Sequence, residues 1–352
     1  MSERGFRVAV VGATGVVGST MLQVLSERDF PASEIVPFAS ERSAGRRIPY
    51  GGRELEVRSL DQKTTEGFDV ALFSAGSSVS REWAPRFVEA GCVVVDNSSA
   101  WRMEEDVPLV VAEVNGSDLE RHRGIVANPN CSTMQMVMAL KPIYDAAGIE
   151  RVIVSTYQST SGTGQNAVEE MYTQAHTMLH GGEAEASVYP HQIAFNVLPQ
   201  VEVFKDGDDY TTEERKMMAE TRKILGDPDI PISATCVRVP VGCGHSESVN
   251  VQTKVYMSPD RCREVLTDFR GVVVLDDPEA GIYPMPIDAA GKDEVLVGRI
   301  RLDPSHENCL NLWIVADNLR KGAATNAVQL AEALAERGLL GGRAAASAAT
   351  GS

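Results

Sequence analysis

The chain is organised around the stretch Ala127-Asn128-Pro129-Asn130-Cys131-Ser132-Thr133-Met134-Gln135, which joins two segments of different hydrophobic pattern. The apolar run 125–127 before it predicts a buried strand, and helically spaced apolar residues follow it as far as Gly148. Asn130 is a residue type that caps helices, so Cys131 is expected at the N-terminus of a helix, where the dipole favours a thiolate. The pattern predicts a cysteine nucleophile that forms a thioester; the alternative is a small buried cysteine without a chemical role.

The composition excludes several classes of protein. With 352 residues, 43% of them hydrophobic and 23% charged, the chain is long enough for two or three globular domains. A net charge of −16 argues against non-specific binding to nucleic acid or to an anionic membrane. We see no signal peptide and no apolar run of the ~20 residues that a membrane helix needs.

The cysteines are scattered and form no CxxC pair, which indicates reduced thiols in the cytoplasm and not a disulfide framework or a zinc site. They are Cys92, Cys131, Cys236, Cys243, Cys262 and Cys309.

The N-terminal segment has the pattern of a nucleotide-binding turn. An apolar run at 6–11 leads directly into Gly12-Ala13-Thr14-Gly15-Val16-Val17-Gly18, and an apolar-periodic segment continues to Leu25. Glycines between a strand and a helix let the backbone approach a pyrophosphate, which then binds at the helix N-terminus. The spacing is GxxGxxG and not GxGxxG, so a simple tight turn is the alternative reading.

The segment after the second expected strand (34–39) indicates which dinucleotide binds. NAD sites usually have a carboxylate there, whereas this chain has Ser40-Glu41-Arg42-Ser43. Ser40, Arg42 and Ser43 can hold a 2′-phosphate, Arg42 through its planar guanidinium. We therefore predict NADP over NAD, against the alternative of a solvated loop.

Alternating strands and helices then predict an α/β, Rossmann-type doubly wound sheet. Ser74 and Arg102 each follow the end of an expected strand, where such sheets bind ligands, and Arg102 is a candidate anion contact. The further strands are expected at 53–58, 69–73, 92–96 and 109–112, with a helix at 80–90.

After the Cys131 helix the pattern changes to an α+β domain with a mixed sheet. Strands are expected at 151–157, 234–240, 248–256, 295–302 and 309–315, and helices at about 166–179, 212–225 and 325–337. We expect residues 1–127, with a C-terminal helix at about 318–338, to form the NADP-binding domain. Residues 128–317 are expected to form the catalytic and dimerisation domain, and residues 341–352 a disordered tail.

Candidate site residues follow from this second pattern. Gln158 ends a strand and can hydrogen-bond a substrate carbonyl, and Ser161 with Gly162 can approach the cofactor. His245, which we place in a flexible glycine-flanked bend, is the predicted acid/base partner of the cysteine. Cys243 beside it is a rival nucleophile that lacks a helix tip.

A metal site is not expected. His176 and His180 have the four-residue spacing of two metal ligands on one helix face, but Thr177 stands where a glutamate would be needed. We read both as solvated or packed histidines.

Six segments together resemble aspartate-β-semialdehyde dehydrogenases of the bacterial type over nearly the whole chain. They are Gly12–Gly18, Ser40-Glu41-Arg42-Ser43-Ala44-Gly45, Asn128-Pro129-Asn130-Cys131-Ser132-Thr133, Ser161-Gly162-Thr163-Gly164, Arg238-Val239-Pro240-Val241 and Asp317-Asn318-Leu319-Arg320-Lys321-Gly322-Ala323. The resemblance implies a homodimer that reduces L-4-aspartyl phosphate to L-aspartate 4-semialdehyde with NADPH. The product lies on the shared route to lysine, methionine and threonine.

The resemblance also implies a role for each matching residue. Cys131 would be the nucleophile, His245 the acid/base and Gln158 the group that orients the acyl intermediate. Arg238 would bind the substrate α-carboxylate and Glu213 its amino group, while the phosphate would be held by Arg102 and Lys216. The implied NADP contacts are Gly12, Thr14, Gly15, Val16, Val17, Ser40, Arg42, Ser43, Ser74, Ser161, Gly162 and Asn318.

Two other functions stay open at this point. A related phosphorylating enzyme such as N-acetyl-glutamyl-phosphate reductase shares the cofactor and the cysteine, but its acetamide substrate has no use for Glu213. A catalytically silent NADP-binding regulatory protein is the alternative of another class, and it has no chemical need for Cys131 or His245.

Overall fold

The computed structural model describes residues 5–61 and 64–340 and divides the chain into two compact units. Unit 1 comprises residues 1–129 and 323–352, and unit 2 comprises residues 130–322. The boundaries lie a few residues beyond those expected from the sequence. The expected tail at 341–352 lies outside the described residues.

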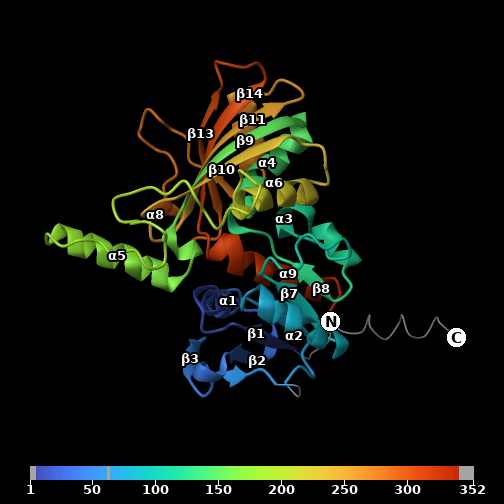
Figure 1. Cartoon of the computed structure of the whole chain (residues 1–352). Helices are drawn as coiled ribbons and strands as arrows, with labels where there is room; N and C mark the ends of the chain where they lie inside the picture. The colour runs from blue at the N-terminus through green and yellow to red at the C-terminus, as the bar shows by residue number, and fades with distance from the viewer. Residues whose placement is uncertain (1–4, 62–63, 341–352) are drawn as a thin grey trace. The chain divides into compact units, whose positions relative to one another are not determined.

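Unit 1 contains a six-stranded parallel sheet (Figure 1). Its strands are β1 (Phe6–Val11), β2 (Ala32–Ala39), β5 (Arg58–Ser59), β6 (Val70–Phe73), β7 (Val93–Asp96) and β8 (Ile125–Ala127). They are arranged in the order β5-β2-β1-β6-β7-β8, so the strand order reverses at β1. In sheets of this kind, ligands bind where the order reverses, beyond the carboxyl ends of the strands.

Helices cover both faces of this sheet because successive side chains of β1 point to opposite sides. Val8 and Val10 pack in one buried cluster with residues of α1 (Val16–Glu27) and α9 (Thr325–Glu336). Ala9 and Val11 pack in a second cluster with residues of α2 (Ser77–Glu89). This two-sided packing confirms the doubly wound fold.

The expected strand at 109–112 is wrong. Leu109 forms only an isolated bridge with Ala127, and the helix α3 (Ala112–Asn115) begins at the end of the apolar run. The N–H of Val111 donates to Asn115 Oδ1, and the N–H of Ala112 donates to Asn326 Oδ1. These side chains take the donors that a strand would have used for pairing.

The expected strand at 53–58 is divided. Residues Arg53–Glu56 form β4, which pairs with β3 (Arg47–Tyr50) in a separate hairpin, and only Arg58–Ser59 joins the edge of the large sheet.

Unit 2 contains a mixed sheet, as predicted. Its strands are β9 (Ile149–Gln158), β10 (Ile232–Arg238), β11 (His245–Thr253), β12 (Val272–Val274), β13 (Val295–Leu302) and β14 (Cys309–Ala316), in the order β10-β9-β11-β14-β13-β12. β9 and β10 run parallel, whereas β11 runs antiparallel to both β9 and β14. Therefore the carboxyl ends of β9 and β10 meet the start of β11.

The helices of unit 2 are α4 (Cys131–Ala147), α5 (Gln165–Leu179), α6 (Thr212–Leu225), α7 (Pro259–Thr267) and α8 (Pro286–Ala289). α4 is almost entirely buried, and it packs against α6 and against β11. α5 extends away from the sheet in Figure 1, and it is fixed to the loop that follows it. Glu170 accepts bonds from the N–H groups of Ser187 and Val188, and Gln174 Oε1 accepts bonds from those of Ile193 and Ala194.

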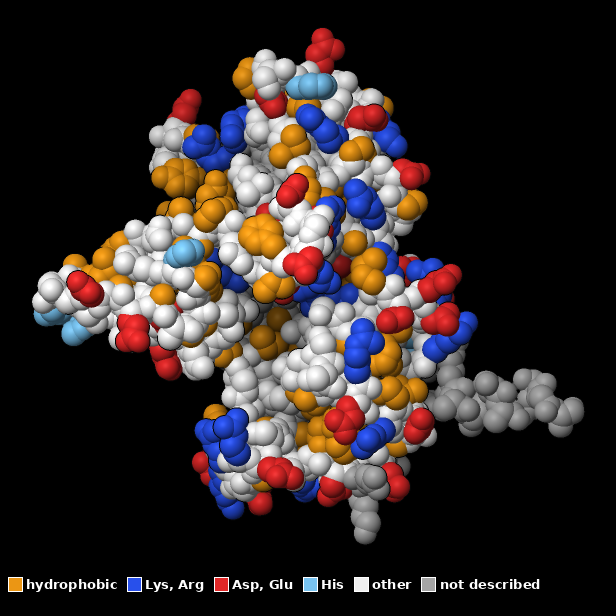
Figure 2. Space-filling model, viewed as in Figure 1, with side chains coloured by type: hydrophobic (Ala, Val, Ile, Leu, Met, Phe, Trp, Pro, Cys, Tyr) orange, Lys and Arg blue, Asp and Glu red, His pale blue; other side chains and the backbone are white. Residues whose placement is uncertain are grey.

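The surface carries both signs of charge. Figure 2 shows acidic and basic side chains interspersed over the face in view. Within residues 5–61 and 64–340, no helix is both long and apolar enough to span a membrane.

Candidate active site

Cys131 is the first residue of α4, as predicted, and Asn130 caps this helix. Asn130 Oδ1 accepts hydrogen bonds from the N–H of Ser132 (3.0 Å) and of Thr133 (3.2 Å). A Cβ added to Gly322 would lie 2.9 Å from the Cys131 Cβ, so only a glycine fits beside the thiol. Cys131 itself is half-buried.

The other cysteines are poor nucleophiles. Burial raises the pKa of Cys92, Cys236 and Cys309, and it raises that of Cys262 to about 12. In the rival Cys243, burial and then the nearby Asp317 raise the pKa to about 12. A thiol with such a pKa carries almost no thiolate near neutral pH.

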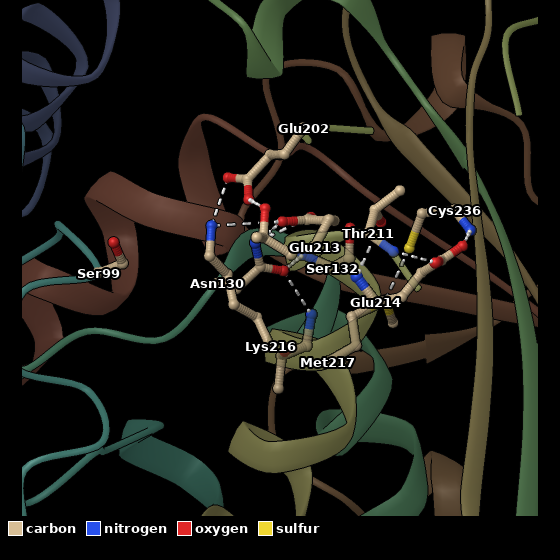
Figure 3. Close-up of polar contacts among 12 residues, drawn as sticks. Ser99, Asn130, Ser132, Glu202, Thr211, Glu213, Glu214, Lys216, Met217 and Cys236 are labelled. Atoms are coloured by element: carbon tan, nitrogen blue, oxygen red, sulfur yellow. Dashed lines mark hydrogen bonds and ion pairs between the residues drawn. The ribbon is translucent and has the colours of Figure 1, made fainter. Parts of the chain in front are cut away.

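A polar network connects the start of α4 to the start of α6 (Figure 3). Asn130 Nδ2 donates to both carboxylate oxygens of Glu213, each at 3.0 Å, while the Asn130 N–H donates to Glu220 Oε2. Gln158 Nε2 donates to Glu213 Oε1 (3.0 Å) and to Ser132 Oγ (2.7 Å). The predicted residues Gln158 and Glu213 therefore contact each other next to the cysteine turn.

The carboxylate of Glu213 is almost completely buried. Burial raises its pKa, and the positive charge of Lys216 opposes this shift. The two amide donors from Asn130 and Gln158 also favour the ionised form, which is the form that binds an ammonium group.

Lys216 has two carboxylate neighbours (Figure 3). Its Nζ lies 3.8 Å from Glu213 Oε2 and forms an ion pair with Glu202, which also accepts a bond from Thr212 Oγ1. Lys216 lies on α6, which begins with a capping box in which Thr211 and Glu214 bond each other's backbone N–H. The neighbouring Arg215 pairs instead with Asp208.

Arg238 ends β10 with 5% of its surface exposed. Its Nη1 donates to the Ser159 carbonyl (2.6 Å), and its guanidinium carbon lies 6.0 Å from the ring centroid of Tyr189. Its Nε has no hydrogen-bond partner among the described residues. A buried guanidinium with a donor to spare is suited to hold a carboxylate.

The expected flexible bend at His245 is wrong, because this residue begins β11 and is completely buried. Pairing with Ala316 of β14 extends the strand to this point. Nδ1 lies 3.0 Å from the backbone nitrogen of Ser159. Burial and the nearby Arg238 hold the pKa of His245 well below its ordinary value, so the resting imidazole is neutral at pH 7.

The three cofactor residues predicted in unit 2 also lie near His245. A Cβ added to Gly162 would lie 3.2 Å from the imidazole and 3.1 Å from Arg238 Nη1, so glycine keeps this edge of the ring open. Asn318 Oδ1 accepts bonds from Ser159 Oγ, Ser161 Oγ and the Gly244 N–H.

The glycine turn of unit 1 fits a dinucleotide. Gly12 has φ +88°, and an added Cβ would lie 2.8 Å from the Ser74 carbonyl carbon. A Cβ on Gly18 would lie 2.1 Å from the Gly12 oxygen. Gly15 is the N-cap of α1 and no side chain caps this helix, so its first N–H groups are available to a pyrophosphate.

The remaining predicted cofactor residues of unit 1 surround this turn in sequence. Thr14 is in the turn, Val16 and Val17 begin α1, and Ser74 directly follows β6. After β2, Ser40 and Arg42 are exposed and Ser43 is half-buried, at and within the 3₁₀ turn η1 (Glu41–Ser43).

Arg102, the other predicted phosphate contact, lies in a bend after β7 and is buried. Its Nη2 donates to the Asn97 carbonyl at 2.9 Å.

No group of three or more histidine, cysteine or acidic residues suited to a metal occurs within residues 5–61 and 64–340. The rings of His176 and His180 stack on each other, with centroids 4.3 Å apart.

Three polar residues of the site had no assigned role in the sequence analysis. Asn130 was identified only as a cap, and Ser159 was passed over although it adjoins Gln158. Glu202 lies in the irregular segment before α6, where no local pattern marks it.

Comparison with known proteins agrees with this geometry. Residues 7–122 match the family described as the semialdehyde dehydrogenase NAD binding domain, and residues 140–321 match the semialdehyde dehydrogenase dimerisation domain. An aspartate-semialdehyde dehydrogenase of Aquifex aeolicus (strain VF5) is 57% identical over 96% of this chain and 100% of its own. The chain belongs to the aspartate-semialdehyde dehydrogenase family. Its membership confirms the predicted enzyme class, the two-domain α/β fold and a nicotinamide cofactor.

Solved structures of aspartate-semialdehyde dehydrogenases have the same fold. Aspartate semialdehyde dehydrogenase II from Vibrio cholerae, complexed with ASA, has a TM-score of 0.92 and 48% identity, covering 95% of this chain and 99% of its own. The Candida albicans enzyme with NADP has a TM-score of 0.71 and 26% identity, covering 96% of this chain and 100% of its own. The match to a semialdehyde dehydrogenase dimerisation domain supports the expected homodimer.

Proposed function

We propose that this protein interconverts L-4-aspartyl phosphate and L-aspartate 4-semialdehyde with NADPH, as a cytoplasmic homodimer on the route to lysine, methionine and threonine. The observation that carries the proposal is the convergence of Cys131, Gln158, Glu213, Arg238 and His245 on the ends of α4, α6, β9, β10 and β11. All six cysteines lie within the described residues and none forms a disulfide, in keeping with a reducing compartment.

Cys131 is the proposed nucleophile. Its thiolate attacks the acyl carbon of aspartyl phosphate; a carbon–sulfur bond forms, the carbon–oxygen bond to phosphate breaks, and phosphate leaves with the electron pair. Gln158 orients the acyl oxygen of the resulting thioester. Lys216 offsets the charge of the departing phosphate.

Arg238 and Glu213 hold the amino-acid end of the substrate. The Arg238 guanidinium matches an α-carboxylate in bidentate fashion, which a lysine cannot reproduce. Glu213 accepts the α-ammonium, and His245 exchanges a proton with the acyl oxygen through Nε2.

NADP is proposed to bind unit 1 through Thr14, Val16 and Val17 at the turn and Arg42 with Ser43 at the 2′-phosphate. When bound, its nicotinamide supplies the hydride. The relative from Candida albicans is described with NADP, which supports this choice over NAD.

The test runs in the oxidative direction, which avoids the unstable acyl phosphate. Purified protein is given L-aspartate 4-semialdehyde, NADP and phosphate, and nicotinamide absorbance is followed, in parallel with N-acetyl-glutamate semialdehyde and with Cys131→Ala. We expect phosphate-dependent NADPH formation with the first substrate only, and none in the variant. Turnover of the second substrate only would move the assignment to the acetylated class. Tight NADP binding without turnover of either would favour the regulatory alternative.

A further inference from the structure

His245 Nδ1 faces two groups of one residue. The backbone nitrogen of Ser159 and its Oγ each lie 3.0 Å from Nδ1. Both side chains are completely buried, so water does not compete for these contacts. The two Ser159 groups differ in what they can do: a backbone N–H only donates a hydrogen bond, whereas a hydroxyl oxygen also accepts one.

The direction of the hydroxyl bond follows from Asn318. The Gly244 N–H donates to Asn318 Oδ1 (3.0 Å), which identifies this atom as the amide oxygen. Ser159 Oγ lies 2.9 Å from the same Oδ1 and donates its hydrogen there. Its other hydroxyl neighbour, Ser161 Oγ at 3.1 Å, itself donates to Asn318 Oδ1. With both hydroxyl hydrogens directed at Asn318, Ser159 Oγ has a lone pair with which to accept a hydrogen from Nδ1.

Each Ser159 group consequently selects one protonation state of Nδ1. The N–H binds a bare Nδ1 and stabilises the neutral ring that carries its proton on Nε2. The Oγ binds an Nδ1 that carries a proton. Nδ1 carries a proton in two states of the ring. One is the imidazolium, which is the acid form; the other is the neutral tautomer with its proton on Nδ1, whose bare Nε2 is the base form.

We propose that Ser159 is the positioning residue that lets His245 act as both acid and base without turning its ring. The inference rests on the proposed role of His245 in the reaction. When the imidazolium gives its Nε2 proton to the substrate oxygen, Nδ1 keeps its own proton on the Ser159 Oγ. The reverse step returns a proton to Nε2, so the protons balance in both directions and His245 is neither oxidised nor reduced.

Other features leave Nε2 as the reacting nitrogen. It has no hydrogen-bond partner among the described residues, and the missing Cβ of Gly162 keeps the adjoining edge of the ring open. Gln135 Nε2 donates to the His245 carbonyl (3.3 Å) and helps to hold the backbone. Arg238 on β10 is the charged group that, after burial, lowers the pKa of His245. Its Nη1 donates to the backbone carbonyl of Ser159, which Ser159→Ala leaves in place.

The test is Ser159→Ala, which removes the Oγ acceptor and keeps the N–H donor. We expect the protonated ring to lose one hydrogen bond, so the pKa of His245 falls and the acidic limb of the oxidative kcat/KM profile moves to lower pH. The rate on the plateau should fall about 2- to 13-fold, the equivalent of one hydrogen bond. Ser233→Ala, at an exposed position on β10, should match the wild type.

A readout that does not depend on turnover is the ¹⁵N resonance pair of His245, assigned with a His245→Asn variant. In the wild type we expect the Nε2–H form at neutral pH, and in Ser159→Ala the same form with its titration moved to lower pH. Ser159→Thr, which restores a hydroxyl, should recover the wild-type titration. An unchanged titration and pH profile in Ser159→Ala would refute the role of the hydroxyl. A wild-type protein inactive on aspartate semialdehyde would refute the proposed function instead, and the resonances would still test the Ser159 contact.

Discussion

The ion pair between Glu202 and Lys216 gives a direct test of the phosphate site. If Lys216 holds phosphate, an arriving phosphate must displace the carboxylate of Glu202, which pairs with the same ammonium. Glu202→Gln removes the competing charge and retains a side chain of the same shape that still accepts hydrogen bonds. We therefore expect the variant to bind phosphate more tightly than the wild type.

The magnitude follows from exposure. The Lys216 side chain is 25% exposed and that of Glu202 is 38% exposed, so solvent screens the pair. Ion pairs of this kind contribute about 0.2–1 kcal/mol. If that energy no longer opposes phosphate, the KM for phosphate should fall about 1.4- to 5-fold.

The assay is the oxidative reaction with phosphate varied at saturating aspartate semialdehyde and NADP. Asp208→Asn is the matched control, because Asp208 pairs with the neighbouring Arg215 and not with Lys216. A phosphate KM that is unchanged or higher in Glu202→Gln, with Asp208→Asn equal to the wild type, would show that Lys216 does not hold phosphate.

Four further predictions test other parts of the molecule. An alkylating agent near pH 7 should modify Cys131 before the other cysteines, whose pKa values are raised; peptide mapping that shows equal labelling would exclude a reactive thiol at the tip of α4. Arg238→Lys should raise the KM for aspartate semialdehyde about 10- to 100-fold, because a charged hydrogen bond and its bidentate geometry are lost. The circular dichroism spectrum should not change, and an unchanged KM would contradict the proposed role of Arg238 in binding the α-carboxylate. Thr211→Ala should lower the free energy of unfolding by about 0.5–2 kcal/mol in urea titrations, because it removes the N-cap of α6; equal midpoints would mean that the cap does not contribute. Burial raises the pKa of Glu170, but hydrogen bonds from Ser187 and its neighbours outweigh this effect and lower it. The stability that Glu170 gives the loop is therefore present above the pKa of the unfolded chain and is lost as the pH falls through the pKa of the folded state. The protection factor of the Ser187 amide, which is its exchange rate corrected for the intrinsic pH dependence of amide exchange, should therefore fall on acidification in the wild type. A Glu170→Gln variant with the same pH response would contradict the reasoning.

Local signals predicted the residues whose environment is built by their own neighbours in sequence. Asn130 caps the helix that Cys131 begins, and the glycines of the first turn lie between β1 and α1. These features depend on backbone donors close in the chain, so spacing alone reveals them.

Errors occurred where distant segments decide the structure. The glycine before His245 predicts a bend, but pairing with Ala316 of β14 makes His245 the first residue of a strand. The run at 109–112 reads as a strand, but the side chain of Asn326 takes the Ala112 N–H. The role of Glu202 depends on Lys216, and that of Ser159 depends on His245. No sequence pattern connects the members of either pair, so only the fold reveals these contacts.

The division of the chain has a consequence for how such a protein can be rebuilt. Unit 2 is an insertion into unit 1, entering after Pro129 and leaving before Ala323. In each unit, the two chain ends at the junctions lie close together. In unit 1, Asn128 Nδ2 donates to the Ala323 carbonyl, and in unit 2, Gly322 lies against Cys131. The host unit can therefore be closed by a very short linker, as is usual where domains are inserted. Because Cys131, the proposed nucleophile, is the second residue of the insertion, any domain grafted in its place would have to bring a nucleophile in its opening residues.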